Sequence, residues 1–181
     1  VQLAERLADM VPVRNAKVFF TSGGGDAIDT AAKLVRRYWS ALGRPGKRTL
    51  ITRTGSYHGL HGYGTSLVGI DVHREGIDPL VPETVRVPTN DSEALDRLVS
   101  EQRDTIAAFF CEPVVGSGGI IHPAPGYLEE AQRICRENDV IFVVDEVIAG
   151  FGRTGAMFAS DRWGLEPDIM IAAKGLTSGY L

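Results

Sequence analysis

Apolar residues along the chain follow two kinds of pattern. Short runs that are apolar at nearly every position are typical of strands buried on both faces of a sheet. Longer stretches with apolar residues three or four positions apart are typical of helices that pack on one side. The first pattern predicts strands at Ala16–Phe20, Arg48–Arg53, Thr84–Pro88, Ile106–Pro113, Val140–Glu146 and Asp168–Ala173.

Helical patterns fall between these strands. Apolar positions from Ala27 to Leu42 keep helical spacing, and Asp26 opens that stretch where negative charge suits the helix dipole. The glycine-rich stretch Thr54–Gly64 is a predicted loop. Alternating strands and helices predict an α/β fold of three layers, a mostly parallel sheet with helices on both faces. The remaining helices are predicted at Val1–Met10, from Asp91 to about Glu101, and at Gly126–Glu137.

Length and composition narrow the class of protein. A chain of 181 residues, 44% hydrophobic and 23% charged, can bury one core, so one domain is expected. A net charge of −4 without a long basic run argues against a nucleic-acid or membrane partner. No apolar run approaches the roughly 18 residues of a spanning helix. Cys111 and Cys135 are too few for a disulfide scaffold, so a cytoplasmic location is expected.

Residues suited to chemistry or ligand binding follow the carboxyl ends of five predicted strands. Ligands of doubly wound sheets bind at these ends, so the residues should surround one crevice. The positions are Gly24-Gly25, Tyr57-His58, Glu112, Asp145 and Lys174.

Two of these residues have both a functional and a structural interpretation. A buried Lys174 would have a lowered pKa and could act as the amine nucleophile and base of Schiff-base chemistry. Taken alone, it is more often a lysine that reaches the surface where its strand ends. Asp145 closes an apolar run and would need a cationic partner, such as a protonated pyridine nitrogen. It could equally cap the segment that follows.

The turn Thr21–Ala27, "TSGGGDA", lies before a helix and could bind a phosphate through its backbone N–H groups. It lacks a P-loop lysine and dinucleotide-site spacing, and a plain flexible turn is the alternative. Tyr57 and His58 could present a flat ring to a heteroaromatic ligand, or plug the rim of the core. His58 and His61 lack further ligands at metal-site spacing, so no metal is expected. No Gly-x-Ser-x-Gly elbow supports a serine hydrolase.

Together these residues resemble the class III aminotransferases, pyridoxal-phosphate enzymes of fold type I. The most specific segments are "DEVIAGFGRTGAMFAS" and "PDIMIAAKGLTSGY", and the spacing from Asp145 to Lys174 suits the family signature. Further support comes from "SGGGDAIDTAAKLVRRYW", "SYHG" and "FFCEPVVGSGGIIHPAPGYL". The resemblance extends over nearly the whole chain.

The resemblance implies a role for each candidate residue. Lys174 would hold pyridoxal 5′-phosphate as a Schiff base, and Asp145 would keep the pyridine nitrogen protonated, so that the ring can act as an electron sink. Lys174 and Asp145 are therefore the expected catalytic residues. Tyr57 and Val147 would lie against the two faces of the ring, with His58 in the same binding group.

The phosphate and the floor of the site complete the implied cofactor-binding set. The backbone N–H groups of Gly24 and Gly25 would bind the phosphate. Glu112 would lie beneath the cofactor as an acid. The expected activity is a ping-pong transfer of an amino group from an amino acid or amine to a keto acid, in which the freed Lys174 amine moves a proton. An aminomutase or decarboxylase of the same fold, or a non-catalytic phosphate-binding module, is the alternative.

Members of this family are longer than 181 residues. Residues 1–181 are therefore expected to form part of the large, cofactor-binding domain, with the small C-terminal domain absent. In the family a phosphate contact comes from the partner subunit, so the full-length protein is expected to be a homodimer. Residues 1–181 alone are expected to be inactive as an aminotransferase.

Overall fold

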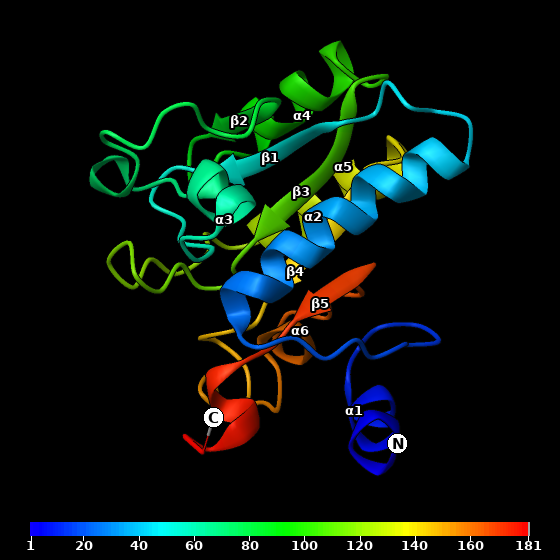
Figure 1. The fold of residues 1–181 in the computed structure, drawn as a ribbon, viewed down its shortest axis with the longest axis vertical. Helices are drawn as coiled ribbons and strands as arrows, with labels where there is room; N and C mark the ends of the chain where they lie inside the picture. Colours follow the sequence, from blue (N-terminus) through cyan, green and yellow to red (C-terminus); the bar gives the residue numbers. More distant parts are fainter. Residues whose placement is uncertain (181) are drawn as a thin grey trace.

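The structure is a computed structural model that describes residues 1–180. Within this range a single parallel sheet of five strands has the order β2–β1–β3–β4–β5. It forms the central layer in Figure 1, and confirms the predicted α/β class. The strands are β1 (Thr49–Arg53), β2 (Thr84–Val87), β3 (Ile106–Cys111), β4 (Ile141–Asp145) and β5 (Ile169–Ile171).

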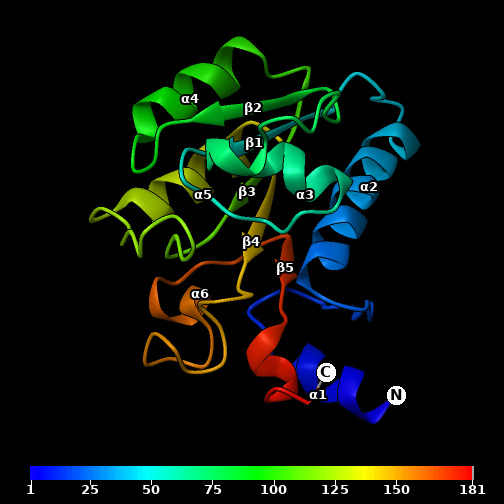
Figure 2. The same ribbon diagram turned by 60° about the vertical axis from the view of Figure 1, so that its left-hand side comes forward.

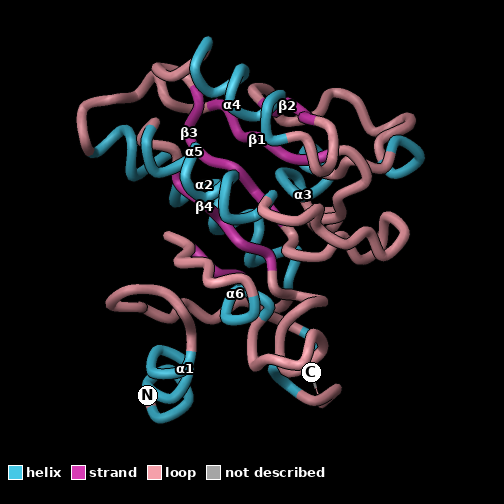
Figure 3. The backbone as a smooth tube through the Cα atoms, turned by 180° about the vertical axis from the view of Figure 1, so that it is seen from behind, coloured by secondary structure: helices cyan, strands magenta, loops and turns pink. Residues whose placement is uncertain are grey.

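Helices cover both faces of the sheet (Figures 2 and 3). Successive side chains of a strand point to opposite faces. Phe109 of β3 accordingly packs in one core with α4 and α5, whereas Phe110 packs in the other with α2. No helix formed by residues 1–180 is long and apolar enough to cross a bilayer. The helices are α1 (Gln2–Met10), α2 (Gly24–Ala41), α3 (Gly62–Leu67), α4 (Ser92–Glu101), α5 (Tyr127–Glu137) and α6 (Ala159–Arg162), with short 3₁₀ turns η1 (Asp71–His73) and η2 (Lys174–Thr177).

The strand order creates a switch point in the middle of the sheet. From β1 the chain continues to β2 on one side, and β3 then pairs with β1 on the other side. The loops that leave the carboxyl ends of β1 and β3 therefore diverge from a common edge. In open parallel sheets such a point opens a crevice for ligands.

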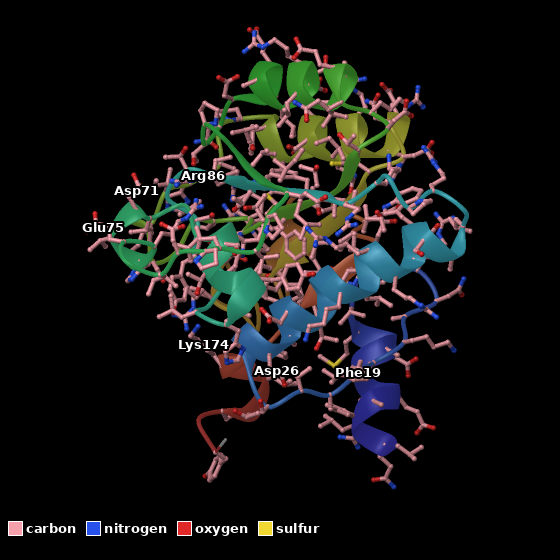
Figure 4. The ribbon with its side chains drawn as sticks, turned by 45° about the horizontal axis from the view of Figure 1, so that its top comes forward. Phe19, Asp26, Asp71, Glu75, Arg86 and Lys174 are labelled. Carbon is pink, nitrogen blue, oxygen red and sulfur yellow. The ribbon has the colours of Figure 1, made fainter. Side chains whose placement is uncertain are left out.

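One predicted strand is wrong. Ala16–Phe20 pairs with no strand among residues 1–180. Phe19 and Phe20 are 76% and 52% exposed, and Figure 4 shows Phe19 on the connection between α1 and α2. A strand forms only where a second strand lies at hydrogen-bonding distance. The local apolar pattern carries no information about that neighbour.

The predicted loop Thr54–Gly64 is also partly wrong, because α3 begins within it at Gly62. The carboxylate of Asp29, on α2, accepts hydrogen bonds from the backbone N–H groups of Tyr63 (2.9 Å) and Gly64 (3.1 Å). These are N–H groups that the first turn of a helix leaves without an intrahelical partner. The cap that stabilises α3 therefore comes from a distant helix, which a local pattern does not reveal.

Lys47 is a buried cation at the amino-terminal end of β1. Its Nζ donates to the carbonyl of Arg103 (2.9 Å) and lies 4.6 Å from the centre of the Trp39 ring. Burial, reinforced by the charge of Arg44, lowers the pKa of Lys47 from its ordinary value of 10.5 to about 8. The folded protein therefore releases this proton at a lower pH than the unfolded chain does.

We expect Lys47 to make the free energy of unfolding depend on pH. The lowered pKa of Lys47 adds a term to the free energy of unfolding. This stabilising term should be fully present above pH 10.5 and be lost as the pH falls through about 8. Urea titrations of the wild type and Lys47→Met between about pH 7 and pH 10 measure this. The stability of the wild type relative to Lys47→Met should rise with pH. A constant difference would contradict the assignment.

Candidate active site

A cavity of about 310 Å³ opens at the carboxyl ends of the strands. Its walls come from the first residues of α2 and from the segments that follow β1, β3, β4 and β5. The structure thus brings together the residues that the sequence assigned to one site, while their individual roles stay predictions. All of them line the cavity: Gly24, Gly25, Tyr57, His58, Glu112, Asp145, Val147 and Lys174.

The glycine turn supplies a helix N-terminus to the cavity, although no strand precedes it. Helix α2 begins at Gly24, and the free N–H groups and dipole of a first turn favour an anion. The space around the turn is narrow. A Cβ atom on Gly24 would lie 3.1 Å from Cγ2 of Val147, and one on Gly25 would lie 3.1 Å from Nδ1 of His61. Because Gly24 and Gly25 have no side chains, the cavity wall at this turn consists of backbone atoms.

Asp145, at the end of β4, is 4% exposed, and its carboxylate has two hydrogen-bond partners among residues 1–180. Its Oδ1 accepts the N–H of Val147 (3.0 Å), and its Oδ2 lies 2.8 Å from Nδ1 of His58. Asp145 thus caps the segment that follows β4, as one of the two interpretations predicted, and it also lines the cavity. Its pairing with a cationic ligand stays a prediction. Both partners hold the carboxylate in a fixed orientation at the cavity wall.

The pairing of His58 with Asp145 was not predicted. The sequence left open whether His58 offers its ring face to a ligand or fills the rim of the core, and in the structure its side chain is buried against the Asp145 carboxylate. The two residues are 87 positions apart, so only the parallel pairing of the strands brings them together. Nε2 of His58 is buried and has no hydrogen-bond partner among residues 1–180.

Glu112, directly after β3, is 3% exposed. One carboxylate oxygen accepts the N–H of Tyr57 (2.9 Å) and the other accepts the N–H of Gly116 (2.9 Å). Burial, with the nearby Asp145 charge, raises the pKa of Glu112, and His58 opposes this change. Glu112 therefore holds two loops of the cavity wall together, one of which carries Tyr57.

The loop that carries Tyr57 rests closely on neighbouring backbone. A Cβ atom on Gly118 would lie 1.9 Å from the carbonyl oxygen of Gly55, so only glycine fits there. The half-buried ring of Tyr57 makes an edge-to-face contact with His73, 5.7 Å between ring centres. The position of Tyr57 is thus limited by the close backbone packing of its loop and by the contact of its ring with His73.

Lys174 follows β5 at the start of η2 and is exposed. Figure 4 shows it near the amino-terminal end of α2, the same helix end that lines the cavity. Within residues 1–180 its exposure agrees with the structural interpretation, a lysine that reaches the surface where its strand ends. Lys174 is nevertheless one of the residues that line the cavity.

Glu146 supports the wall from behind and was not predicted to do so. It is fully buried, and its carboxylate accepts the N–H of Ala159 (3.0 Å) and both the N–H (2.6 Å) and hydroxyl (2.8 Å) of Ser160. Burial raises the pKa of Glu146, which these hydrogen bonds oppose. The segment that begins with Val147 is thereby tied to α6.

Further residues line the cavity wall without having been assigned to the site: Gly23, Ile28, Gly59, Ile148 and Ala173. Gly23 lies in the turn that was predicted to bind a phosphate. Gly59, Ile148 and Ala173 each adjoin a predicted site residue. Ile28 lies one helical turn after Gly24, on the face that α2 turns to the sheet.

Comparison with known proteins agrees with this geometry. The family model for class-III aminotransferases matches residues 1–181. A protein named a probable aminotransferase from Mycobacterium tuberculosis is 41% identical over 99% of this chain and 42% of its own length. The putrescine–pyruvate aminotransferase of Pseudomonas aeruginosa is 38% identical over 100% of this chain and 44% of its own.

Solved structures give the same result. A transaminase from the marine bacterium Virgibacillus superposes with a TM-score of 0.96 at 41% identity, covering 99% of this chain and 42% of its own. The omega transaminase of Pseudomonas jessenii, solved in complex with PMP, has a TM-score of 0.95 at 39% identity, covering 99% and 44%. The chain thus spans less than half the length of these relatives. It belongs to the class-III aminotransferase family.

Proposed function

We propose that the protein is a pyridoxal-phosphate-dependent aminotransferase that moves an amino group from an amino acid or amine to a keto acid. The observation that carries this proposal is the composition of the cavity. A lysine amine (Lys174), a carboxylate paired with a histidine (Asp145) and the N-terminus of α2 line the same space. Family membership supports the same class of reaction.

The residues present fit pyridoxal phosphate. The cavity volume is at the lower end of the usual range for small-molecule sites. The start of α2 offers N–H donors for a phosphate, and the Asp145 carboxylate offers an anionic partner for a protonated ring nitrogen. Gly24 leaves open the space that a side chain would fill.

Each residue has a defined task in this proposal. When bound, pyridoxal phosphate supplies an electron sink conjugated to the substrate carbon. Lys174 would hold the cofactor through Nζ, and the same nitrogen, once free, would carry a proton from the substrate carbon. Asp145 would hold a proton on the ring nitrogen by charge, while His58 keeps its carboxylate in place. Tyr57 and Val147 would confine the ring between them.

Three finer assignments belong to this proposal. The family resemblance supports a partial large domain within residues 1–181 and a homodimeric full-length protein. The low number of cysteines supports a cytoplasmic location. An aminomutase or decarboxylase would use the same cofactor residues. Transfer is favoured because the named relatives are aminotransferases.

Absorbance spectroscopy on the full-length protein, which is longer than residues 1–181, tests the proposal. Adding pyridoxal phosphate should produce a visible band from lysine-bound cofactor, and an amine donor with pyruvate should then be converted. Lys174→Ala should lose the band and the conversion. Lys33→Ala, which changes a lysine of α2 that does not line the cavity, serves as the control and should retain both. A wild type without a band would refute the proposed function.

A further inference from the structure

Arg53, the last residue of β1, is a buried cation next to the site. It is 1% exposed, and its Nη2 donates to the backbone carbonyl of Glu112. The guanidinium lies over the ring of Tyr127, 5.6 Å from its centre, and Nε has no hydrogen-bond partner among residues 1–180. Removing a guanidinium from water is costly, so its burial here calls for a physical reason.

The reason lies in how β1 and β3 are joined at their carboxyl ends. Their backbone pairing ends at Ile51 and Phe109. Beyond this point the Arg53 side chain reaches the Glu112 carbonyl, and the Glu112 carboxylate reaches back to the N–H of Tyr57. We call these two hydrogen bonds the strand-end clasp. They replace the missing backbone ladder at the edge where the cavity opens.

Arg53 itself stands outside the cavity. It is not among the described residues that line it, whereas Glu112 and Tyr57 are. Arg53 therefore lacks a direct contact with the cavity, and the clasp is the set of hydrogen bonds that links it to residues of the cavity wall. The hydroxyl of Ser56 also donates to the Arg53 carbonyl (2.7 Å), which holds the backbone at the Arg53 end of the clasp.

We propose that Arg53 is a positioning residue for cofactor binding, which fixes the backbone of Glu112 and so sets where Glu112 holds Tyr57 on the cavity wall. This inference rests on the proposed function. Arginine suits the task because its planar fork stays charged and can stack on Tyr127 while it donates to a carbonyl. Lysine would keep the charge without the fork.

The test uses pyridoxine 5′-phosphate, which lacks the aldehyde and cannot bond covalently to Lys174. Its affinity for the full chain is measured by calorimetry for the wild type, Arg53→Met and Arg53→Lys. Lys47→Met is the matched control, because Lys47 is likewise 1% exposed and donates to a backbone carbonyl, but at the other end of β1. Arg53→Met should weaken binding roughly tenfold or more, since small displacements of site residues have large effects.

The outcomes separate positioning from a general loss of stability. Lys47→Met should keep its affinity within about twofold, and Arg53→Lys should recover part of the loss. Arg53→Met combined with Glu112→Gln should lose less than the product of the two single effects, because both act through the clasp. Unchanged affinity in Arg53→Met, or an equal loss in Lys47→Met, would overturn the inference.

Three further results are also decisive. If Arg53→Met does not fold, Arg53→Lys carries the test, with a loss of a few fold expected and an unchanged affinity overturning the inference. A folded wild type that does not bind pyridoxine 5′-phosphate would overturn the proposed function, and this inference with it. Wild-type binding with unaffected Arg53 variants would overturn the inference alone.

Discussion

Asp145→Asn should lower the turnover number of the full chain roughly 10³-fold, about 4 kcal/mol in the activation barrier. The asparagine has nearly the same shape, so the fold should be kept. Its neutral amide, however, cannot hold a proton on a ring nitrogen by charge. It would also face Nδ1 of His58 with only one oxygen left to accept, where the carboxylate accepts from both His58 and Val147.

Steady-state kinetics with an amine donor and pyruvate measure this effect. Asp168→Asn is the control, since the exposed Asp168 also accepts a backbone N–H, that of Phe142 in β4 (2.8 Å), at the opposite end of the strand from Asp145. Asp168→Asn should keep a turnover number close to that of the wild type. If Asp145→Asn does the same, the proposed role of Asp145 is wrong.

Glu146→Ala should lower the free energy of unfolding by about 3 kcal/mol. The reason is that the buried N–H groups of Ala159 and Ser160 and the Ser160 hydroxyl would all lose their acceptor. Burial makes such a loss more costly, because water cannot replace the carboxylate. Glu146→Gln keeps one oxygen acceptor and should lose less.

Urea titration of the full chain measures the stability of these variants. Glu166→Ala is a suitable control, because among residues 1–180 its exposed carboxylate forms only surface ion pairs, with Arg14 and Arg136. Such pairs contribute about 0–1 kcal/mol. Equal losses in Glu146→Ala and Glu166→Ala would show that the buried hydrogen bonds of Glu146 add little to stability.

The amino-acid sequence by itself determined the class of fold and most of its elements. Apolar runs such as Ile106–Cys111 identify strands because a strand buried on both faces can tolerate few polar side chains. The start of α4 was also predictable, since Asp91 caps its own helix by accepting the N–H of Ala94 (2.8 Å). These signals are local, and local physics produces them.

The sequence also identified most of the candidate site. In a parallel sheet all strands end at the same edge, so polar residues after strands, such as Glu112 and Asp145, must come near one another. A residue's position directly after a strand can be seen in the local sequence, and it also determines at which edge of the sheet the residue lies. This is why the sequence alone predicts that residues far apart along the chain share one cavity.

Only the tertiary structure decided the pairings. The bond between His58 and Asp145, the strand-end clasp of Arg53, Glu112 and Tyr57, and the Asp29 cap of α3 all join segments distant in sequence. For the same reason Ala16–Phe20 was wrongly predicted as a strand. A hydrogen bond needs its two partners within about 3 Å, and that distance is set by how whole elements pack and not by the residues on either side.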